Sequence, residues 1–452
     1  MAIPYCEAMD LVQEVAHQKA CKFRQETEYV SITSALGRIC SENYHSPSST
    51  PPFDTSAMDG FAVNSAKTSG ATQEHPHTLR VVGTIAAGDV PISPSDASNG
   101  ECAVCVEIMT GAPFPGSDEF DACIKMEETV TVRGSDEKHR YIQISKPAKS
   151  NQNRRCAGND FQKDDIVICS GTMIQPQHIM ALASLGLSKV MVYRRLRVGV
   201  ISTGSELVSH QDPRVPSTSQ IRDSNGPYIE AVLSGLGIEV TNLGIVEDNA
   251  REFQSTLSRC FSESPFDAII TSGAVSMGKY DFMGAAIQAM GAKIRFHKTA
   301  IRPGHPVLFA TIPGRKTGFE SIHTPPYSPA ESDVAFFGLP GNPLASAVCL
   351  RFLAIPYFQS LHCVHRKAIK SQAILVSPSG TSQGFKKPRH LQVFWHGKRT
   401  AGDGVTISND QASNKMRPLL DASCWVGVPP GIEVLGPGDV VEIHEMYPSL
   451  GS

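Results

Sequence analysis

Three short apolar runs decide the fold of this chain: RVGVIS at residues 197–202, DAIIT at 267–271 and VAFFGL at 334–339. Each run is rich in Val, Ile or Phe and continues into a polar loop, respectively TGSE, SGAVSMGKYD and PGNP. This pattern is typical of short strands that are buried on both faces of a sheet. The region from Arg197 to Tyr357 is therefore predicted to be built around these strands.

Helix-compatible segments lie between the runs, at residues 226–236, 251–261 and 282–290. Alternating strands and helices predict a parallel sheet that is covered by helices on both faces. Ligands of such sheets bind beyond the carboxyl ends of the strands. The charged residues expected at those ends are Glu206, Asp223, Asp248, Asp281 and Arg302.

Length and composition restrict the possible classes of protein. A chain of 452 residues exceeds what one core usually supports, so two to four units are expected. The net charge of −3 offers no basic field for nucleic acid. No run approaches the roughly 18 apolar residues of a membrane span, and the N-terminus lacks the pattern of a secretion signal. A cytoplasmic protein is therefore expected.

The twelve cysteines follow no regular spacing. Cys102 and Cys105 form one CxxC, but a second pair at zinc-finger spacing is missing, so thiols in a buried strand are favoured over a metal site. Reduced thiols fit the cytosol.

The pattern predicts a multidomain α/β plus β protein. Residues 1–46 and 148–192 are expected to form a partly helical linker domain, with a small β-rich domain inserted at 47–147. The α/β domain spans 193–364, and the alternating runs AILV, LQVFW, GVTIS, CWVGV and DVVEIHEM predict a C-terminal β domain at 365–452. Residues 314–333 are polar and are interpreted as an exposed insertion.

Eight motifs in order along nearly the whole chain resemble the MoeA family, which includes the E domains of gephyrin and of plant molybdenum-cofactor enzymes. They are LGRICSENYHSPSSTPPFDTSAMDGFAV, IMTGAPFP, NRRCAGNDF, ASLGLSKVMVYRRLRVGVISTGSELV, QIRDSNGPYI, TSGAVSMGKYDF, AIRPGHPVLFA and GLPGNP. The IRDSN sequence looks like that of a eukaryotic E domain.

This resemblance implies a molybdenum insertase that takes adenylylated molybdopterin and molybdate, places the metal on the dithiolene and releases AMP with the help of Mg²⁺. It also implies a central three-layer α/β domain of the MogA/MoaB type and a barrel-like C-terminal domain. Members are homodimers whose active cleft lies between the α/β domain of one chain and the inserted β domain of the other. The molybdopterin adenylyltransferase domain is a candidate partner.

Both substrates are anions, so the expected site consists of backbone N–H groups, helix N-termini and a cation. Glycines let backbone approach phosphate closely, although every strand-to-helix connection could carry them. The candidate residues in the three loops are Gly204, Ser205, Gly273, Ser276, Gly278, Gly338, Gly341 and Asn342. Asp223 and Asp248, at the carboxyl ends of the predicted strands, are also candidates for binding substrate.

Mg²⁺ needs one or two carboxylates besides substrate oxygens. Glu206 and Asp281 match acidic positions of the family, and Asp281 is the first candidate for a metal or hydrolytic role. Asp281 could equally cap the helix that follows it. The resemblance implies that Asp59 and Thr110 reach in from the partner chain; from the residues alone, Asp59 is more often a turn former and Thr110 part of a strand-ending loop.

The family's molybdate-binding positions fall here on Arg302, Pro303, Arg389 and Ser413. Arg389 could also be a solvated surface cation. Several positions depart from the family pattern. Two family lysines are replaced by Arg302 and His305, an acidic position by Lys279, and a glycine by Ala274, which is expected to avoid positive φ. PGNPVS reads PGNPLA, so Ala345 replaces serine and the next serine is Ser346. An oxyanion pocket tolerates these changes, so an active transferase is favoured.

The alternative is a catalytically weak relative that acts as a dimeric scaffold or peptide-binding protein. A nucleotide-dependent oxidoreductase is disfavoured because STGSEL lacks the GxGxxG spacing.

Overall fold

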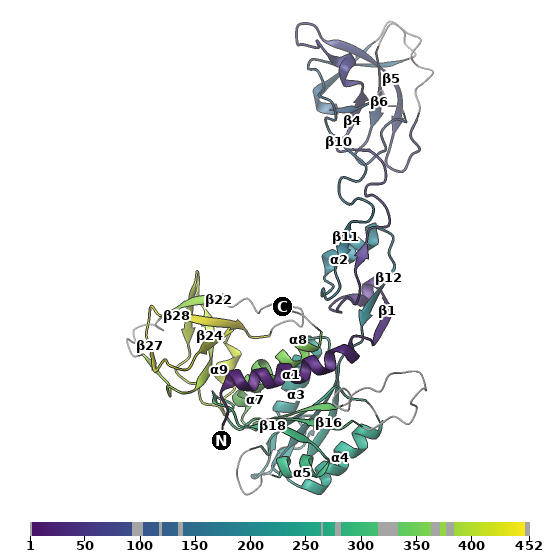
Figure 1. The fold of residues 1–452 in the computed structure, drawn as a ribbon. Coiled ribbons are helices and arrows are strands. Elements are labelled where there is room, and N and C mark those ends of the chain that lie inside the picture. The colour runs from purple at the N-terminus through teal and green to yellow at the C-terminus, as the bar shows by residue number, and fades with distance from the viewer. Residues whose placement is uncertain are drawn as a thin grey trace. The chain divides into compact units, whose positions relative to one another are not determined.

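The computed structural model describes most of the chain, namely residues 2–92, 103–116, 120–133, 139–263, 265–275, 282–314, 333–362, 371–376 and 384–447. It contains two compact units (Figure 1). Unit one comprises residues 1–42, 170–176 and 189–452, and unit two comprises 43–169 and 177–188. The chain therefore crosses between the units four times, at 42/43, 169/170, 176/177 and 188/189.

The central sheet of unit one has six strands in the order β16-β13-β17-β21-β20-β18. Their bounds are β13 (Arg197–Thr203), β16 (Glu239–Val246), β17 (Ala268–Ser272), β18 (Lys293–His297), β20 (Leu308–Ile312) and β21 (Val334–Leu339). The first four strands in this order are parallel, as predicted, and the last two pair antiparallel. The three predicted strands lie side by side at the middle of the sheet.

Helices cover both faces of this sheet (Figure 1). Along β13 the side chains of Val198 and Val200 join one buried cluster, whereas Ile201 joins the other, because successive strand residues point to opposite faces. The first cluster includes helices α1 (Tyr5–Phe23), α3 (Asn225–Gly235), α7 (Pro343–Cys349) and α8 (Ile355–Leu361). The second includes α4 (Ala250–Glu263) and α5 (Met283–Ala289). The predicted three-layer α/β domain is confirmed.

The expectation that no segment is long and apolar enough to cross a membrane does not hold for the helical stretch Pro343–Leu361. With 19 residues and a mean hydropathy of 1.4, it is long and apolar enough to cross a membrane, although it contains Arg351. However, 78% of its most apolar window is buried inside the structure. It therefore packs as a core helix of unit one.

The C-terminal segment forms a closed barrel, because β24 pairs with β26 as well as with β25. The five strands are β22 (Ser371–Leu375), β24 (Gln392–Arg399), β25 (Gly404–Ile407), β26 (Cys424–Val428) and β28 (Val440–Glu445). The short strand β19 (Ile301–Arg302) pairs in parallel with β24. This pairing places Arg302 beside the barrel.

Unit two contains a six-stranded sheet in the order β7-β4-β6-β5-β9-β8, which confirms the inserted β-rich region. The strands are β4 (Gly60–Val63), β5 (His77–Ile85), β6 (Val104–Ile108), β7 (Ala122–Lys125), β8 (Thr129–Arg133) and β9 (Arg140–Ile144). Cys105 lies buried in β6, as expected, and burial raises the pKa of its thiol to about 12. Cys102 lies outside the described residues.

Shorter elements connect these parts. They are α2 (Pro176–Ser184), α9 (Arg417–Leu420), β1 (Thr27–Ser31), β2 (Tyr44–His45), β3 (Thr55–Ser56), β10 (Arg154–Arg155), β11 (Ile166–Ile168), β12 (Lys189–Tyr193), β14 (Leu207–Val208), β15 (Ile221–Arg222), β23 (Phe385–Lys386) and β27 (Val434–Leu435). β1 pairs with β12, so parts of 1–46 and 148–192 do meet, whereas α1 packs against α8 in unit one. The four-domain division remains a prediction, and the insertion at 314–333 falls almost wholly outside the described residues.

Candidate active site

Backbone hydrogen bonds tie the first and second of the three loops to the ends of neighbouring strands. The N–H of Gly204, after β13, donates to Val246 O at the end of β16 at 3.2 Å. The N–H of Gly273, after β17, donates to Leu339 O at the end of β21 at 2.9 Å. These bonds hold the predicted loops at one edge of the sheet.

The position of Gly273 admits no side chain. Its φ is +104°, and a Cβ there would lie 2.3 Å from the backbone oxygen of Thr203. Glycine is therefore required where the first and second loops meet. An added Cβ at Gly341, in the third loop, would in turn lie 3.7 Å from the Cα of Gly273, so all three loops come together here.

The expectation for Ala274 is wrong. This residue adopts a φ of +51°, in the left-handed region that it was expected to avoid. The loop keeps the conformation that the family's glycine would allow, although the left-handed region is strained for alanine.

Asn225 joins the candidate site, although the sequence pattern did not predict it. It opens α3, and its Nδ2 donates to Ser272 Oγ and to Gly341 O, both at 2.7 Å. It therefore ties the start of a helix to the second and third loops. Its place directly after IRDS, in one of the eight motifs, was the available signal.

Asp223 fixes the start of the same helix. Its Oδ2 accepts a hydrogen bond from Ser202 Oγ at 2.6 Å, and its Oδ1 accepts one from Gly226 N at 3.0 Å. The residue is buried and both carboxylate oxygens have protein partners. Asp223 is thus placed to position α3, and its direct contact with substrate stays a prediction.

The first loop also touches the loop that follows β16. The N–H of Asp248 donates to Ser205 Oγ at 3.3 Å, and both residues are exposed. Glu206 is exposed too, and its Oε2 lies 2.6 Å from where a Cβ of Gly204 would be. Two carboxylates, Glu206 and Asp248, are therefore carried by touching loops, facing solvent.

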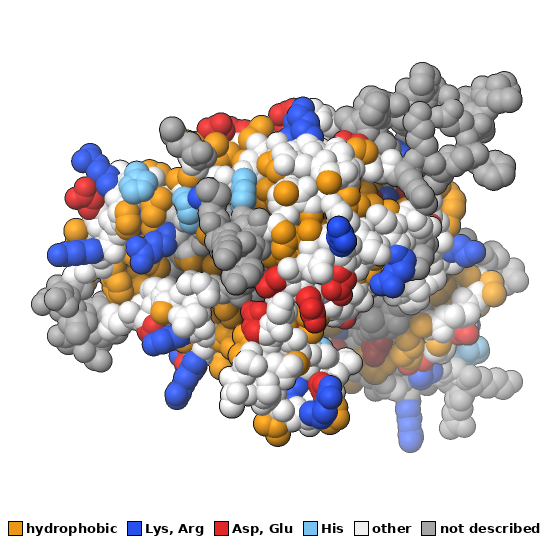
Figure 2. All heavy atoms as spheres, turned by 90° about the horizontal axis from the view of Figure 1, so that it is seen from below, with side chains coloured by type: hydrophobic (Ala, Val, Ile, Leu, Met, Phe, Trp, Pro, Cys, Tyr) orange, Lys and Arg blue, Asp and Glu red, His pale blue; other side chains and the backbone are white. Residues whose placement is uncertain are grey.

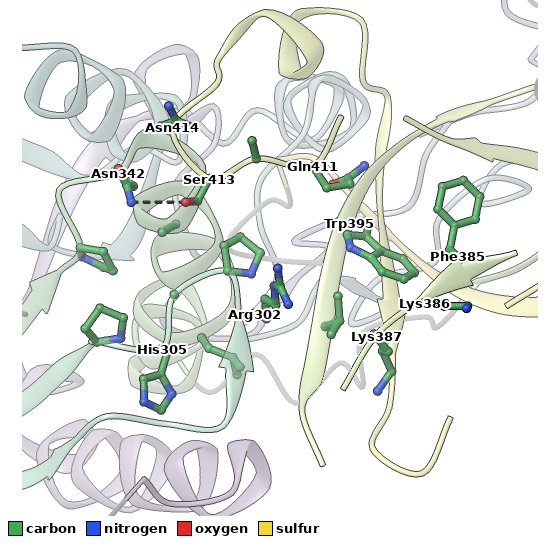
Figure 3. A pocket seen from close by; sticks show the side chains of 18 of the residues that line it. Arg302, His305, Asn342, Phe385, Lys386, Lys387, Trp395, Gln411, Ser413 and Asn414 are labelled. Carbon is green, nitrogen blue, oxygen red and sulfur yellow. Dashed lines mark hydrogen bonds between the residues drawn. The ribbon is translucent and has the colours of Figure 1, made fainter. Parts of the chain in front are cut away.

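A cavity of about 580 Å³ lies in unit one, between the third loop, the Arg302 loop and the barrel (Figure 3). We call it the cationic cavity. Its basic lining residues are Arg302, His305, Lys386 and Lys387, and no Asp or Glu among the described residues lines it. A site with this charge favours an anion.

Four residues predicted for substrate or molybdate meet in this cavity: Arg302, Pro303, Asn342 and Ser413. Asn342 Nδ2 donates to Ser413 Oγ at 3.3 Å, and Leu344 N donates to Ser413 O at 3.0 Å. In Figure 3, Arg302 lies between the Asn342–Ser413 pair and β24, which carries Trp395. The third loop therefore belongs both to the sheet edge and to this cavity.

The two lysines of the cavity were also missed, because KKPRH looked like an ordinary surface run. Lys387 is buried and its Nζ donates to Leu391 O at 2.7 Å; desolvation lowers the pKa of its amine. His305 is exposed, and its Nδ1 lies 2.9 Å from Thr299 O, so the ring is held by backbone. Arg302 and Lys386 are the exposed Arg and Lys side chains of the described lining.

Arg389 does not line this cavity. Its side chain is exposed, and its backbone oxygen accepts a hydrogen bond from Gly431 N at 2.8 Å. The structure thus does not bring Arg389 together with Arg302, Pro303 and Ser413 in this cavity, and its role in binding molybdate stays a prediction.

Asp59 and Thr110 come together, but in unit two. Asp59 Oδ1 accepts hydrogen bonds from the Thr110 N–H at 2.6 Å and from its hydroxyl at 2.8 Å, and these bonds lower the pKa of the Asp59 carboxyl. The nearby Asp54 accepts bonds from Ala157 N and from Arg154. Asp59 is fully exposed and ionised, and Thr110 is held against it.

The remaining predicted residues, Ser276, Gly278, Lys279 and Asp281, lie outside the described residues. Within the part of the chain that the structure describes, no group of three or more His, Cys, Asp or Glu side chains could by itself hold a metal ion.

Comparisons with known proteins agree with this geometry. Residues 3–186 match the MoeA N-terminal region (domain I and II), and residues 199–360 match a family described as a probable molybdopterin binding domain. The chain is 30% identical over 447 residues to a molybdopterin molybdenumtransferase of Synechococcus elongatus, covering 99% of this chain and 100% of that protein. It is 36% identical over 339 residues to the Haemophilus influenzae protein of the same name, covering 75% of this chain and 74% of that protein.

A similar solved structure is the molybdopterin biosynthesis MoeA protein of Pyrococcus horikoshii, with a TM-score of 0.71, 26% identity and coverage of 99% of both chains. The matches extend over both units and over the loops described above. The chain belongs to the MoeA family of molybdopterin molybdenumtransferases.

Proposed function

We propose that this protein is a molybdenum insertase of molybdenum cofactor biosynthesis. It takes adenylylated molybdopterin and molybdate, transfers the metal to the dithiolene and releases AMP. The cationic cavity is the observation that carries this proposal: it has no acidic lining among the described residues, and the third loop links it directly to the glycine loops at the sheet edge. The names of the relatives, all molybdopterin molybdenumtransferases, support the same reaction.

Molybdate binds in the cationic cavity in this proposal. Arg302 supplies the charge, Ser413 and Asn342 supply neutral hydrogen-bond donors, and Pro303 shapes the wall. An oxyanion of this size fits easily into about 580 Å³, which leaves room for the dithiolene that receives the metal. The phosphate groups of the other substrate lie on the glycine loops, where backbone N–H groups can approach closely.

Mg²⁺ is proposed to bind beside the first loop. The donors fit, because the ion needs only one or two protein carboxylates when substrate oxygens and water complete its shell. Glu206 is the described candidate, Asp248 lies on the touching loop, and Asp281 is proposed as the second ligand. The ion would neutralise charge on the phosphoanhydride that is cleaved.

The assay of AMP release tests the reaction. Purified protein supplied with adenylylated molybdopterin, molybdate and Mg²⁺ is expected to release AMP, and Asp281→Ser is expected to abolish this while leaving dimerisation unchanged. A folded wild-type protein that releases no AMP would refute the proposal and leave a binding or scaffold role.

A homodimer with a shared site is part of the proposal, because Asp59 and Thr110 present an ionised carboxylate from unit two. Subunit complementation tests it. Asp59→Asn and Asp281→Ser variants, each inactive alone, are unfolded and refolded together. If each site takes Asp59 from one chain and Asp281 from the other, half of the dimers contain one intact site, and about a quarter of wild-type activity returns. Activity that stays at the level of the single variants would exclude the shared site.

We also propose a cytoplasmic location. The irregular spacing of the twelve cysteines, which suggests no disulfide framework, supports a reducing compartment.

A further inference from the structure

A second cavity, of about 430 Å³, lies in unit one and differs from the cationic cavity in the charge of its lining. It is formed by the first turns of α3 and α7, by residues 416–422 around α9, and by the end of the described chain at Met446 and Tyr447. No charged residue lines it among the described residues. We call it the apolar cavity.

The apolar cavity shares its walls with the proposed active site. Asn342 lines the cationic cavity and Pro343, the next residue, lines the apolar one. Similarly, the segment 409–422 presents Ser413 to the cationic cavity and Met416 to the apolar one. Asn225, which ties the glycine loops together, also lines the apolar cavity. A molecule with a charged part and an apolar part could therefore occupy both cavities at once.

The side chains of the apolar cavity suit a flat ring. Tyr228 and Tyr447 give it aromatic surface, and Met416 and Met446 give polarizable surface. Burial, and then the neighbouring Tyr447, raise the pKa of Tyr228, so its phenol stays neutral. At the rim, Leu420 is 83% exposed and Tyr447 is 56% exposed. Large apolar side chains that gather in this way around a cavity mark a binding surface.

One polar group in this cavity has an unused acceptor. Asn225 is only 8% exposed, and its amide orientation is fixed because Nδ2 must donate to the carbonyl oxygen of Gly341. Its Oδ1 then accepts no hydrogen bond from the described residues. An acceptor without a partner, on a residue that lines a cavity, favours a ligand with an N–H donor.

We propose that the apolar cavity binds a planar, uncharged nitrogen heterocycle of the substrate, stacked against tyrosine and bonded through a ring or exocyclic N–H to Asn225 Oδ1. This inference rests on the proposed function, because it assigns one end of adenylylated molybdopterin to a cavity adjacent to the anion site. Two rings of that substrate share this chemistry, adenine and pterin, and the experiment separates them.

Calorimetric titration of the full chain with AMP and, separately, with molybdopterin tests the assignment. Tyr447→Ala removes exposed aromatic surface at little risk to the fold, and Leu420→Trp adds a bulky ring at the rim. Both variants are expected to weaken one of the two ligands by roughly five- to 150-fold, the range of a lost base–aromatic contact. Molybdate affinity is expected to stay unchanged in both. Tyr29→Ala is the matched control, because Tyr29 on β1 is 63% exposed and lines neither cavity.

A loss confined to AMP supports adenine as the occupant, and a loss confined to molybdopterin supports pterin. If the wild type binds both ligands and neither variant weakens either, the inference is overturned while the proposed function stands. A wild type that binds neither ligand would overturn the proposed function and this inference with it.

Discussion

Replacing Arg302 by glutamine should specifically weaken molybdate binding. Arg302 is exposed in a cavity without acidic lining among the described residues, and Lys387, which also lines it, already donates to Leu391 O. Arg302 and Lys386 therefore supply most of the available charge. A hydrogen bond to a charged group contributes about 1.5–3 kcal/mol, so its loss should raise the Kd for molybdate by about 10- to 150-fold.

Two further variants make this prediction specific. Arg302→Lys keeps the charge but loses the planar fork, so an intermediate loss is expected. Arg389→Gln removes an exposed arginine that lies outside the cavity lining, and its Kd should stay within about twofold of wild type. Because Arg302 is exposed, the difference between Arg302→Gln and wild type should shrink as salt rises.

The assay is equilibrium dialysis against molybdate at low and high ionic strength, with AMP release measured in parallel. If Arg302→Gln binds molybdate as wild type does, or if Arg389→Gln loses as much affinity as Arg302→Gln, the cationic cavity is not the molybdate site.

Three other changes have predictable outcomes. Gly273→Ala should destabilise unit one by about 2–4 kcal/mol and abolish AMP release, because the added Cβ would meet Thr203 O and the φ is unfavourable for alanine. Gly235→Ala, with open space around the added Cβ, is the control. Equal denaturation midpoints for the two variants would contradict the argument. Ala274→Gly should be neutral or stabilising by up to about 1 kcal/mol, because relief of the left-handed strain exceeds the entropy cost of glycine, whereas Ala286→Gly in α5 should destabilise. Burial lowers the pKa of His362 to about 4, so the unfolded chain binds its proton first as pH falls, and stability is lost between about pH 6.5 and 4. The free energy of unfolding that this one group loses is about 3 kcal/mol. His362→Phe should therefore flatten the dependence of unfolding free energy on pH over that range, as measured by urea denaturation at each pH. An unchanged dependence would exclude His362 as its source.

Much of the fold was predictable because strand and helix periods are local properties of a sequence. The three central strands, their parallel order and the two helical layers follow from runs such as VAFFGL and the apolar centre of RVGVIS. Continuous apolar runs of this length are typical of strands that are buried on both faces. The C-terminal strands were equally predictable from alternation, but their closure was implied only by the family resemblance. Closure depends on β24 pairing with β26 across intervening sequence, and alternation alone does not specify which strands meet.

Residues of the candidate site were predictable where they belong to a recognisable motif, as with Gly273, Asn342 and Arg302. Asn225 was missed because its role is defined by partners 47 and 116 positions away, which no local pattern reveals. Lys386 and Lys387 were missed because a basic run has the same composition whether it faces solvent or a cavity. Ala274 shows the opposite error, since a residue preference was given more weight than the surrounding backbone that determines φ.

Because the chain crosses between the two units four times, it could be divided into two polypeptides at one of these crossings. Residues 2–42 are held in unit one by buried side chains of α1 and by the pairing of β1 with β12, whereas the peptide bond at 42/43 leads into unit two. A gene interrupted at that bond would encode two polypeptides that reassociate without a covalent link. Assembly of the insertase from these two polypeptides would then be controlled by the supply of the N-terminal peptide of about forty residues.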